Sequence, residues 1–168
     1  MPGDPEDWRD ALARHGPALM LFARQWAAST ADAEDAVQDG FVRFWRSRHG
    51  SRDPVPYLYA CVRSAAIDLY RTNVRRRKVD SVRASPEPSS AFAPSDGPEQ
   101  AELAVAIDAA LARLPQEQRE VLVMKTWGNL TFAQIAESLA ISPNTAASRY
   151  RYAIERLEAA LAHEVRHE

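Results

Sequence analysis

Residues 131–157 read TFAQIAESLAISPNTAASRYRYAIERL, and this pattern predicts two helices joined by a tight turn. Ser142 is a preferred N-cap residue, and Pro143 suits the first helical position, where its missing N–H is not needed. The apolar residues of the second helix recur at helical spacing: Ala146, Tyr150, Ala153 and Leu157. Its opposite face is polar and partly basic, which is typical of the recognition helix of a helix-turn-helix. We therefore expect DNA binding here, with a plain helical hairpin as the alternative.

The residues ahead of this stretch also predict helices. One is expected over about 7–15, a second opens at Pro17, a third follows a cap at Ser29 or Thr30, and a long one runs from Pro54 to about 77. Gly40 falls inside the third of these, where glycine costs about 1 kcal/mol relative to alanine. The pattern alone gives no reason for that glycine.

A stretch rich in proline and serine divides the chain. Residues 79–98 read VDSVRASPEPSSAFAPSDGP, a composition that predicts a flexible linker. No alternation typical of strands appears on either side. The sequence therefore predicts an all-α fold of two helical domains, 6–78 and 99–162, which the linker allows to act at separate places on one target.

Charge is segregated along the chain, although the net charge of the 168 residues is only −2. Residues 61–78 are strongly basic, whereas residues 96–120 are rich in acids. The long helix expected over about 57–77 combines these arginines with aromatic residues at Tyr57, Tyr59 and Tyr70, and arginines with aromatic rings suit phosphates and unpaired bases. For any one tyrosine, a place in the core is an equal alternative.

Signatures of catalysis are missing from the sequence. There is no glycine-rich phosphate loop, no Gly-x-Ser-x-Gly and no carboxylate pair beside a histidine, so we expect a binding protein rather than an enzyme. The single Cys61 excludes an internal disulfide, and the scattered histidines indicate no metal site and no cofactor. Without a signal peptide or an apolar run that spans a bilayer, a cytoplasmic location is expected.

Three segments resemble the extracytoplasmic-function (ECF) class of bacterial RNA polymerase sigma factors, in the order found in that family. They are DAEDAVQDGFVRFWR (32–46), PYLYACVRSAAIDLYRTNVRRRK (56–78) and LPQEQREVLVMKTWGNLTFAQIAESLAISPNTAASRYRYAIERL (114–157). The resemblance implies that the first docks on the polymerase, the second reads and melts the −10 promoter element, and the third reads the −35 element. It implies a transcription initiation factor with a region 2-like and a region 4-like module.

The resemblance also implies roles for individual residues. Those expected to dock on the polymerase are Asp35, Gln38, Asp39 and Arg43, while Phe41 and Trp45 are expected to face the core. Those expected at the −10 element are Arg52, Arg63, Ser64, Arg71, Asn73, Arg75, Arg76 and Arg77. Those expected at the −35 element are Asn144, Thr145, Ser148, Arg149, Arg151 and Tyr152. Asp68 is equally well a structural partner of an arginine, and Arg149 equally well a member of an internal ion pair.

The partners implied by the resemblance are promoter DNA and core RNA polymerase, through the clamp helices of its largest subunit and the flap of its second-largest subunit. An anti-sigma factor that masks both modules is implied as well. The alternative from the residues is a helix-turn-helix regulator that binds duplex DNA as a dimer, with 6–78 as its dimerisation or sensing domain. It explains residues 131–157 equally well but gives no role to the basic cluster at 71–78.

Overall fold

The computed structural model describes residues 5–47, 53–79 and 106–165, and all regular structure in these ranges is helical. The all-α fold class predicted from the sequence is confirmed. We call the helices of residues 5–79 the first module: α1 (Pro5–Ala23), α2 (Thr30–Ser47) and α3 (Pro54–Val79). The second module, residues 106–165, has a helical segment at 106–112, followed by α5 (Gln116–Thr126), α6 (Phe132–Leu139) and α7 (Pro143–Val165). In the described ranges no helix has the length and apolar composition that a bilayer crossing requires.

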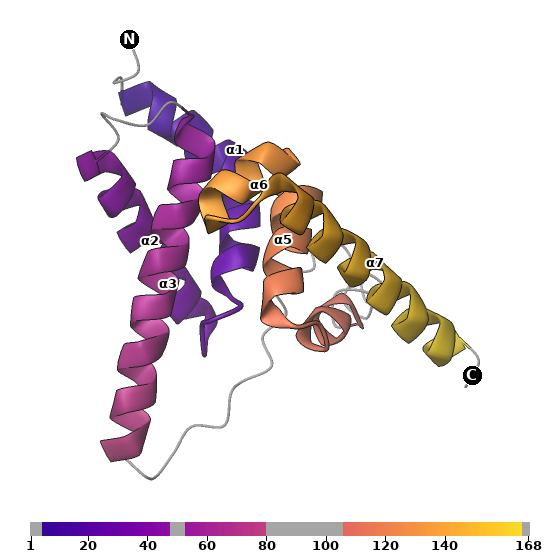
Figure 1. The fold of residues 1–168 in the computed structure, drawn as a ribbon. Helices are drawn as coiled ribbons and strands as arrows, with labels where there is room; N and C mark the ends of the chain where they lie inside the picture. Colours follow the sequence, from indigo (N-terminus) through magenta and orange to yellow (C-terminus); the bar gives the residue numbers. More distant parts are fainter. Residues whose placement is uncertain (1–4, 48–52, 80–105, 166–168) are drawn as a thin grey trace.

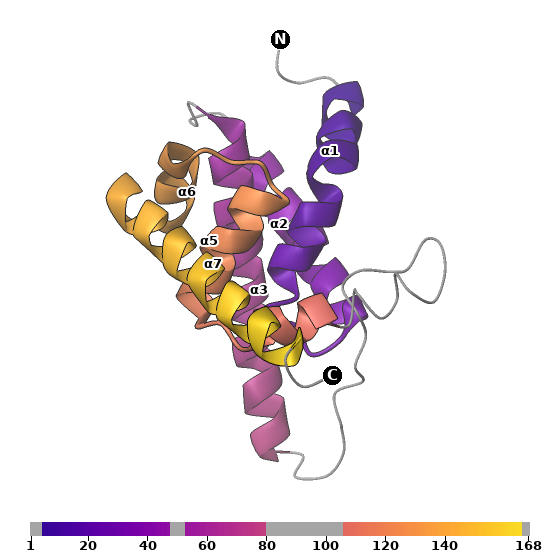
Figure 2. The same ribbon diagram turned by 90° about the vertical axis from the view of Figure 1, so that its right-hand side faces the viewer.

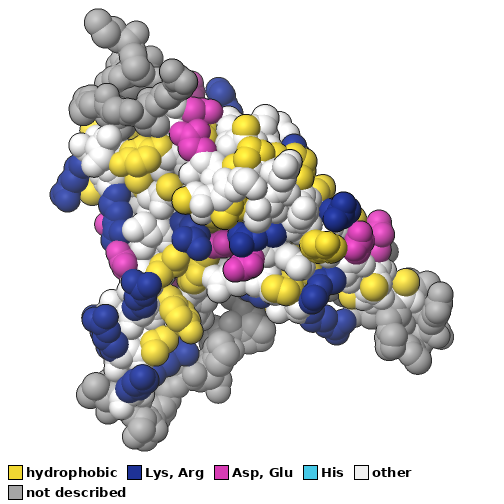
Figure 3. Space-filling view, in the orientation of Figure 1, with side chains coloured by type: hydrophobic (Ala, Val, Ile, Leu, Met, Phe, Trp, Pro, Cys, Tyr) yellow, Lys and Arg dark blue, Asp and Glu magenta, His cyan; other side chains and the backbone are white. Residues whose placement is uncertain are grey.

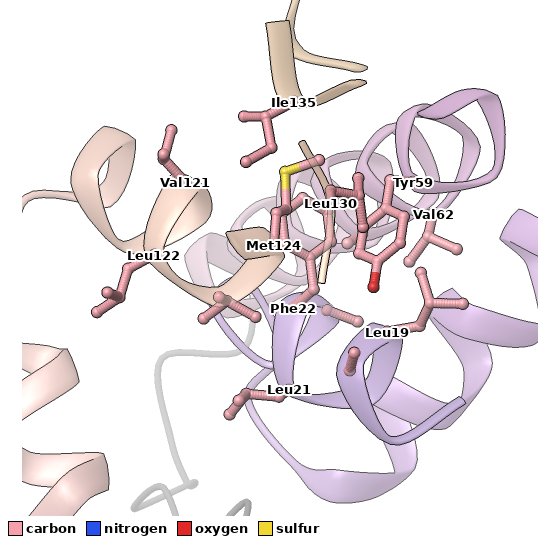
Figure 4. Packing of buried hydrophobic residues seen from close by; sticks show 14 of the residues in the cluster. Leu19, Leu21, Phe22, Tyr59, Val62, Val121, Leu122, Met124, Leu130 and Ile135 are labelled. Atoms are coloured by element: carbon pink, nitrogen blue, oxygen red, sulfur yellow. The ribbon is translucent and has the colours of Figure 1, made fainter. Parts of the chain in front are cut away.

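The two modules lie against each other. In Figures 1 and 2, α5 and α6 lie beside α1 and α3, whereas α7 is on the outer side of the second module. Buried apolar side chains from both modules form one core cluster, which includes Phe22 of α1, Tyr59 of α3, and Met124 and Leu130 of the second module. Figure 4 shows these side chains grouped together. Removing apolar surface from water therefore stabilises the closed arrangement as well as each module.

Helix α1 corrects the prediction of two helices separated near Pro17. The helix runs without a break from Pro5 to Ala23 with the proline inside it. Pro17 has no N–H to donate to the preceding turn, which usually disfavours the interior of a helix. Here Leu19 and Phe22, on the far side of the proline, are fully buried in the core. Their burial explains why packing overrides the local preference of the chain.

Gly40 owes its place to the packing of α2 on α3. A Cβ at this position would lie 2.5 Å from Val62 Cγ2 and 2.6 Å from Val62 Cα, closer than carbon atoms approach without displacement. The absence of a side chain therefore lets the two helix backbones come together. The cost of glycine in a helix is offset by this close packing.

Candidate nucleic-acid and polymerase interfaces

Caps fix both helices of the helix-turn-helix. Thr131 Oγ1 accepts a hydrogen bond from the backbone N–H of Gln134 (3.2 Å), and Gln134 Oε1 accepts one from the N–H of Thr131 (2.9 Å). This capping box was readable from the Thr-x-x-Gln spacing, but the sequence analysis missed it. Ala140 ends α6 in a left-handed conformation, with φ of 53°. Ser142 then caps α7 as predicted, because its Oγ accepts a hydrogen bond from the N–H of Thr145 at 3.0 Å.

The outer face of α7 carries the six residues predicted to contact the −35 element. Four of them are exposed and two are half-buried: Asn144, Thr145, Arg151 and Tyr152, then Ser148 and Arg149. The Arg151 guanidinium lies 5.1 Å from the centre of the Tyr152 ring and 3.8 Å from a carboxylate oxygen of Glu155. The opposite face packs inward, with Ala146 and Ala153 fully buried. The helix therefore presents one polar face outward, with the dimensions that a major groove admits.

Arg149 has a partner inside the second module. Its Nη2 lies 3.2 Å from Oε2 of Glu117 on α5, and its side chain is 24% exposed. The internal ion pair that the sequence left open as an alternative is therefore formed. The carboxylate of Glu117 is 70% exposed, so the pair lies at the surface and contributes little to stability by itself.

The C-terminal half of α3 carries a basic surface. Its exposed arginines are Arg71, Arg75, Arg76 and Arg77. Figure 3 shows dark blue side chains gathered over this end of the helix and more of them along α7. Asn73 is half-buried, and its amide donates to Asp32 Oδ2 at 3.1 Å, which joins α3 to the start of α2. The predicted residue Arg52 lies outside the described residues.

The three tyrosines of α3 have different surroundings. Tyr59 is fully buried and packs edge-to-face on Phe22, with ring centres 5.4 Å apart, so it belongs to the core. Tyr57 is half-buried beside Phe44. Tyr70 is 51% exposed on the same helix as the arginines. Of the three, Tyr70 has the exposure that stacking on an unpaired base requires.

A network of charges joins α2 to α3 near the predicted polymerase-docking residues. Arg43 Nη1 donates to Asp68 Oδ2 (2.9 Å) and to Ser64 Oγ (3.0 Å), while its Nη2 lies 2.8 Å from Asp39 Oδ2. Asp68 is thus a partner of an arginine, which is one of the two roles left open for it. The other predicted docking residues, Asp35 and Gln38, are exposed on α2.

The end of α2 also has an apolar hollow that the sequence did not reveal. It is lined by Phe41, Val42, Trp45 and Arg46. Val42 and Trp45 are 45% and 41% exposed, so Trp45 does not face the core as expected, whereas Phe41 packs against the core cluster. Exposure of two large apolar side chains side by side on a helix is a common feature of protein-docking surfaces.

Arg63, predicted at the −10 element, instead contacts the second module. Its Nε donates to Oε1 of Glu120 at 2.7 Å, and its guanidinium lies 5.9 Å from the centre of the Trp26 ring. The Glu120 side chain is only 3% exposed. Burial raises the pKa of this carboxyl, and the hydrogen bond and charge of Arg63 oppose that rise. No spacing in the sequence could have paired two residues that lie so far apart in the chain.

The described residues contain no group of three or more His, Cys, Asp or Glu side chains placed to hold a metal ion. The candidate sites described above are charged and polar surfaces. Such surfaces bind macromolecules through phosphates, base edges and complementary charges.

Comparison with known protein families matches each module to a region of the sigma-70 family. Residues 11–76 match Sigma-70 region 2, and residues 104–157 match Sigma-70, region 4. The chain is 26% identical over 163 residues to the ECF RNA polymerase sigma factor RpoE of Cereibacter sphaeroides, covering 92% of this chain and 86% of that protein.

The solved structures that share the fold include two complexes. One is the sigma factor RpoE in complex with the anti-sigma factor NepR from Bartonella quintana, with a TM-score of 0.71, 24% identity, and coverage of 94% of this chain and 98% of that one. The other is CnrH in complex with the cytosolic domain of CnrY, with a TM-score of 0.66, 25% identity, and coverage of 96% and 91%.

Proposed function

The chain belongs to the ECF class of the sigma-70 family of RNA polymerase sigma factors, and from that premise we propose that it directs core RNA polymerase to promoters by reading a −10 and a −35 element. The observation that carries the proposal is a pair of outward surfaces on two modules of one chain, a basic one on α3 and a polar, partly basic one on α7. The protein itself performs no chemical step. It acts in the cytoplasm, where the polymerase and the promoters are.

The second module reads the −35 element as duplex DNA. Its support is the capped helix α7, whose outer face offers Asn144, Thr145, Ser148 and Arg151 as hydrogen-bonding groups. Side chains of these types contact base edges and phosphates in the major groove. Tyr152 and Arg149 belong to the same surface. Arg149 would leave its ion pair with Glu117 and bind a DNA phosphate instead.

The first module binds the −10 element and holds it open. Arg71, Arg75, Arg76 and Arg77 neutralise phosphates, and the exposed ring of Tyr70 is available to stack on an unpaired base. Unstacking a base costs a few kcal/mol, which binding of the separated strand offsets. Strand opening therefore needs binding energy alone.

Core polymerase docks on α2. The surface offered is the exposed pair Asp35 and Gln38 with the Asp39–Arg43 ion pair, continued by the hollow at Trp45. Mixed charges beside exposed apolar side chains suit a specific protein partner. The clamp helices of the largest polymerase subunit bind this surface of α2, and the flap of the second-largest subunit binds the second module.

An anti-sigma factor is a further proposed partner. Two of the solved structures that share the fold are complexes, one of a sigma factor with NepR and the other of CnrH with the cytosolic domain of CnrY. A partner that covers the two basic surfaces would keep this protein from promoters until a signal releases it. The dimeric regulator considered as the alternative accounts for the helix-turn-helix equally well, but it gives no role to the region 2 match over residues 11–76.

The test combines purified protein with core RNA polymerase and then performs run-off transcription on fragmented genomic DNA. We expect a stable complex and discrete transcripts that neither component yields alone. If folded, inhibitor-free protein does not bind the core enzyme, the proposal fails. Asp35→Lys with Gln38→Ala should weaken the complex, whereas Arg14→Ala, an exposed change on α1, should not.

A further inference from the structure

A hollow lies in the first module, between the turn that joins α1 to α2 and the last turns of α3. It is lined by Gln25, Trp26, Ala27, Ala28, Tyr70, Asn73, Val74 and Arg77. All of these residues belong to the first module, and those on α3 lie at the end of the helix away from Pro54. The volume of the hollow is about 250 Å³. Drug-sized ligands occupy about 300–1,000 Å³, so the hollow suits a smaller group, of the size of a single nucleobase.

Gln25 has hydrogen-bonding groups in this hollow that the protein does not use. Its amide nitrogen and its amide oxygen are both shielded from water, and neither has a hydrogen-bond partner among the described residues. Leaving both ends of a buried amide unpaired is unfavourable, and folded proteins rarely do so. A ligand that accepts from the nitrogen and donates to the oxygen would supply both missing bonds. The chemistry of Gln25 therefore points to a ligand with a donor beside an acceptor.

The walls around Gln25 are held in place by contacts of their own. The N–H of Gln25 donates to the carbonyl oxygen of Phe22 (3.3 Å), which ties the turn to the end of α1. Trp26 packs edge-to-face on the same Phe22, with ring centres 5.3 Å apart. On the α3 side, the Asn73 amide donates to Asp32 at 3.1 Å. A ligand would thus meet a site that is already formed, which lowers the cost of binding.

The exposed part of the lining suits a base that carries a phosphate. Tyr70 is 51% exposed and Arg77 is exposed, so these two side chains are free to move aside and admit a ligand. An aromatic ring stacks on a base, and a guanidinium binds a phosphate. The exposed Arg75 and Arg76 directly precede Arg77, and Figure 3 shows hydrophobic side chains among the dark blue ones over this part of α3. A nucleic-acid strand on the basic surface would therefore pass the hollow.

Among the purines, adenine matches the Gln25 amide. The amide oxygen would accept from the N6 amino group of adenine while the amide nitrogen donates to N7, which is the usual pairing of glutamine with this base. Guanine presents two acceptors, O6 and N7, along the same edge. It would leave the amide oxygen of Gln25 unpaired. We therefore expect the hollow to prefer adenine to guanine.

We propose that this hollow is a binding site for one unpaired adenine, held by Gln25 and Tyr70 with its phosphate at Arg77. An adenine of the separated promoter strand is the source that the proposed function supplies, and to that extent the inference rests on the proposed function. A free adenine nucleotide has the same chemistry, and the experiments below distinguish the two sources. Gln25 lies in a turn between helices, where no motif in the sequence marks it.

A double-mutant cycle between protein and DNA tests the strand as the source. Holoenzyme binds a promoter fragment with a pre-opened −10 region, in which each adenine of one strand is replaced in turn by an abasic site. Gln25→Leu keeps the size of the side chain and removes the amide, so it should weaken binding by about tenfold. At one position the abasic site should cost no more with Gln25→Leu than Gln25→Leu costs alone, because both changes remove the same contact. At all other positions the losses should add.

The matched control is Gln118→Leu on α5. Gln118 Oε1 is also buried without a hydrogen-bond partner, but it belongs to the second module and lies outside the hollow. This variant should show no such coupling at any position. Urea denaturation checks that Gln25→Leu acts on binding, since loss of an unpaired buried amide should leave the free energy of unfolding unchanged or raise it. A marked loss of stability would show that the amide has a structural role and would overturn the inference.

Calorimetry of the free chain with adenosine 5′-monophosphate tests the other source. Saturable binding that is stronger than that of guanosine 5′-monophosphate, and is lost with Gln25→Leu and with Arg77→Gln, would support the site with a free nucleotide as its ligand. Neither coupling on DNA nor binding of the nucleotide would overturn the site. If the unaltered holoenzyme recognises no promoter at all, the proposed function fails, while the calorimetric measurement still decides whether the site binds adenine.

Discussion

At the scale of single residues, Gly40 and Gly16 offer a matched pair. Gly40→Ala places a methyl group against the Val62 backbone, and overpacking of this kind lowers the free energy of unfolding by about 2 kcal/mol. Gly16→Ala meets the Leu12 side chain at ordinary contact distance, with Cδ1 at 3.6 Å, and should raise the free energy of unfolding by up to about 1 kcal/mol through helix propensity. Urea denaturation followed by circular dichroism measures both. Shifts of the same sign would show that the close approach of α2 and α3 is not what requires Gly40.

Ala140 is the residue where the turn of the helix-turn-helix strains the backbone. Its φ of 53° and ψ of 46° are left-handed, a conformation that glycine adopts without penalty. Ala140→Gly should therefore raise the free energy of unfolding by about 0.5–1 kcal/mol. Ala133→Gly, an exposed helical position in α6, should lower it by a similar amount. Thermal denaturation distinguishes the two, and a loss of stability in both variants would contradict the prediction.

His15 makes the stability depend on pH. Burial lowers its pKa below the ordinary value of 6.5, and the charge of Arg14 adds to the effect. The neutral form is thus favoured in the folded protein, so this contribution is present above pH 6.5 and is lost as the pH falls through the lowered pKa. His15→Gln should show a smaller loss of stability on acidification. An NMR titration of the His15 ring with a pKa above 6.5 would refute the argument.

At the scale of elements, we expect the outer face of α7 to carry the sequence specificity of DNA binding. Arg151→Ala removes an exposed guanidinium from its outer face, and loss of a base contact costs about 1–3 kcal/mol, or about five- to 150-fold in affinity. We expect that loss for holoenzyme on DNA with the −35 element and little loss on DNA without it. Arg14→Ala on α1 removes the same charge elsewhere and is the control. Equal weakening on both DNAs would place Arg151 on a phosphate.

The exposed arginines at the end of α3 should make DNA binding depend on the salt concentration. Arg75, Arg76 and Arg77 are exposed in succession, and each phosphate contact contributes about 0.7–0.9 to the slope of log affinity against log salt. Replacing all three by glutamine should make the slope less steep by about 2–3, with similar losses on all promoters. Filter binding of holoenzyme over a range of salt concentrations measures this. An unchanged slope would remove the three arginines from the phosphate surface.

The helices differ in how well their starts and ends can be predicted from the sequence. The start of α7 was predictable because Ser142 and Pro143 act within one turn, and the same holds for Ser29, whose Oγ accepts from the N–H of Asp32 at 3.1 Å. The continuity of α1 through Pro17 was not predictable from the sequence, because it depends on the burial of residues beyond the proline. Helix caps depend on neighbouring residues, whereas packing depends on partners elsewhere in the chain.

At the scale of the whole molecule, the residue pattern and the resemblance together predicted the candidate surfaces, but neither predicted which contacts these residues make in the folded chain. Arg63 was assigned to DNA on sequence grounds, and only the folded chain brings it to Glu120. The Asp53–Gln134 contact likewise joins residues from opposite sides of the linker. A proline- and serine-rich segment indicates that two parts can separate, but it does not indicate that they close on each other.

The proposed function requires one chain to read two promoter elements for the polymerase. Hydroxyl-radical footprinting of holoenzyme on a promoter found by run-off transcription distinguishes this from binding by a dimeric regulator. We expect two unlike protected patches about 25 base pairs, or about 85 Å, apart, the upstream one lost selectively with Arg151→Ala and the downstream one with the Arg75, Arg76 and Arg77 substitutions. One symmetrical patch, protected equally without polymerase, would refute the proposed function.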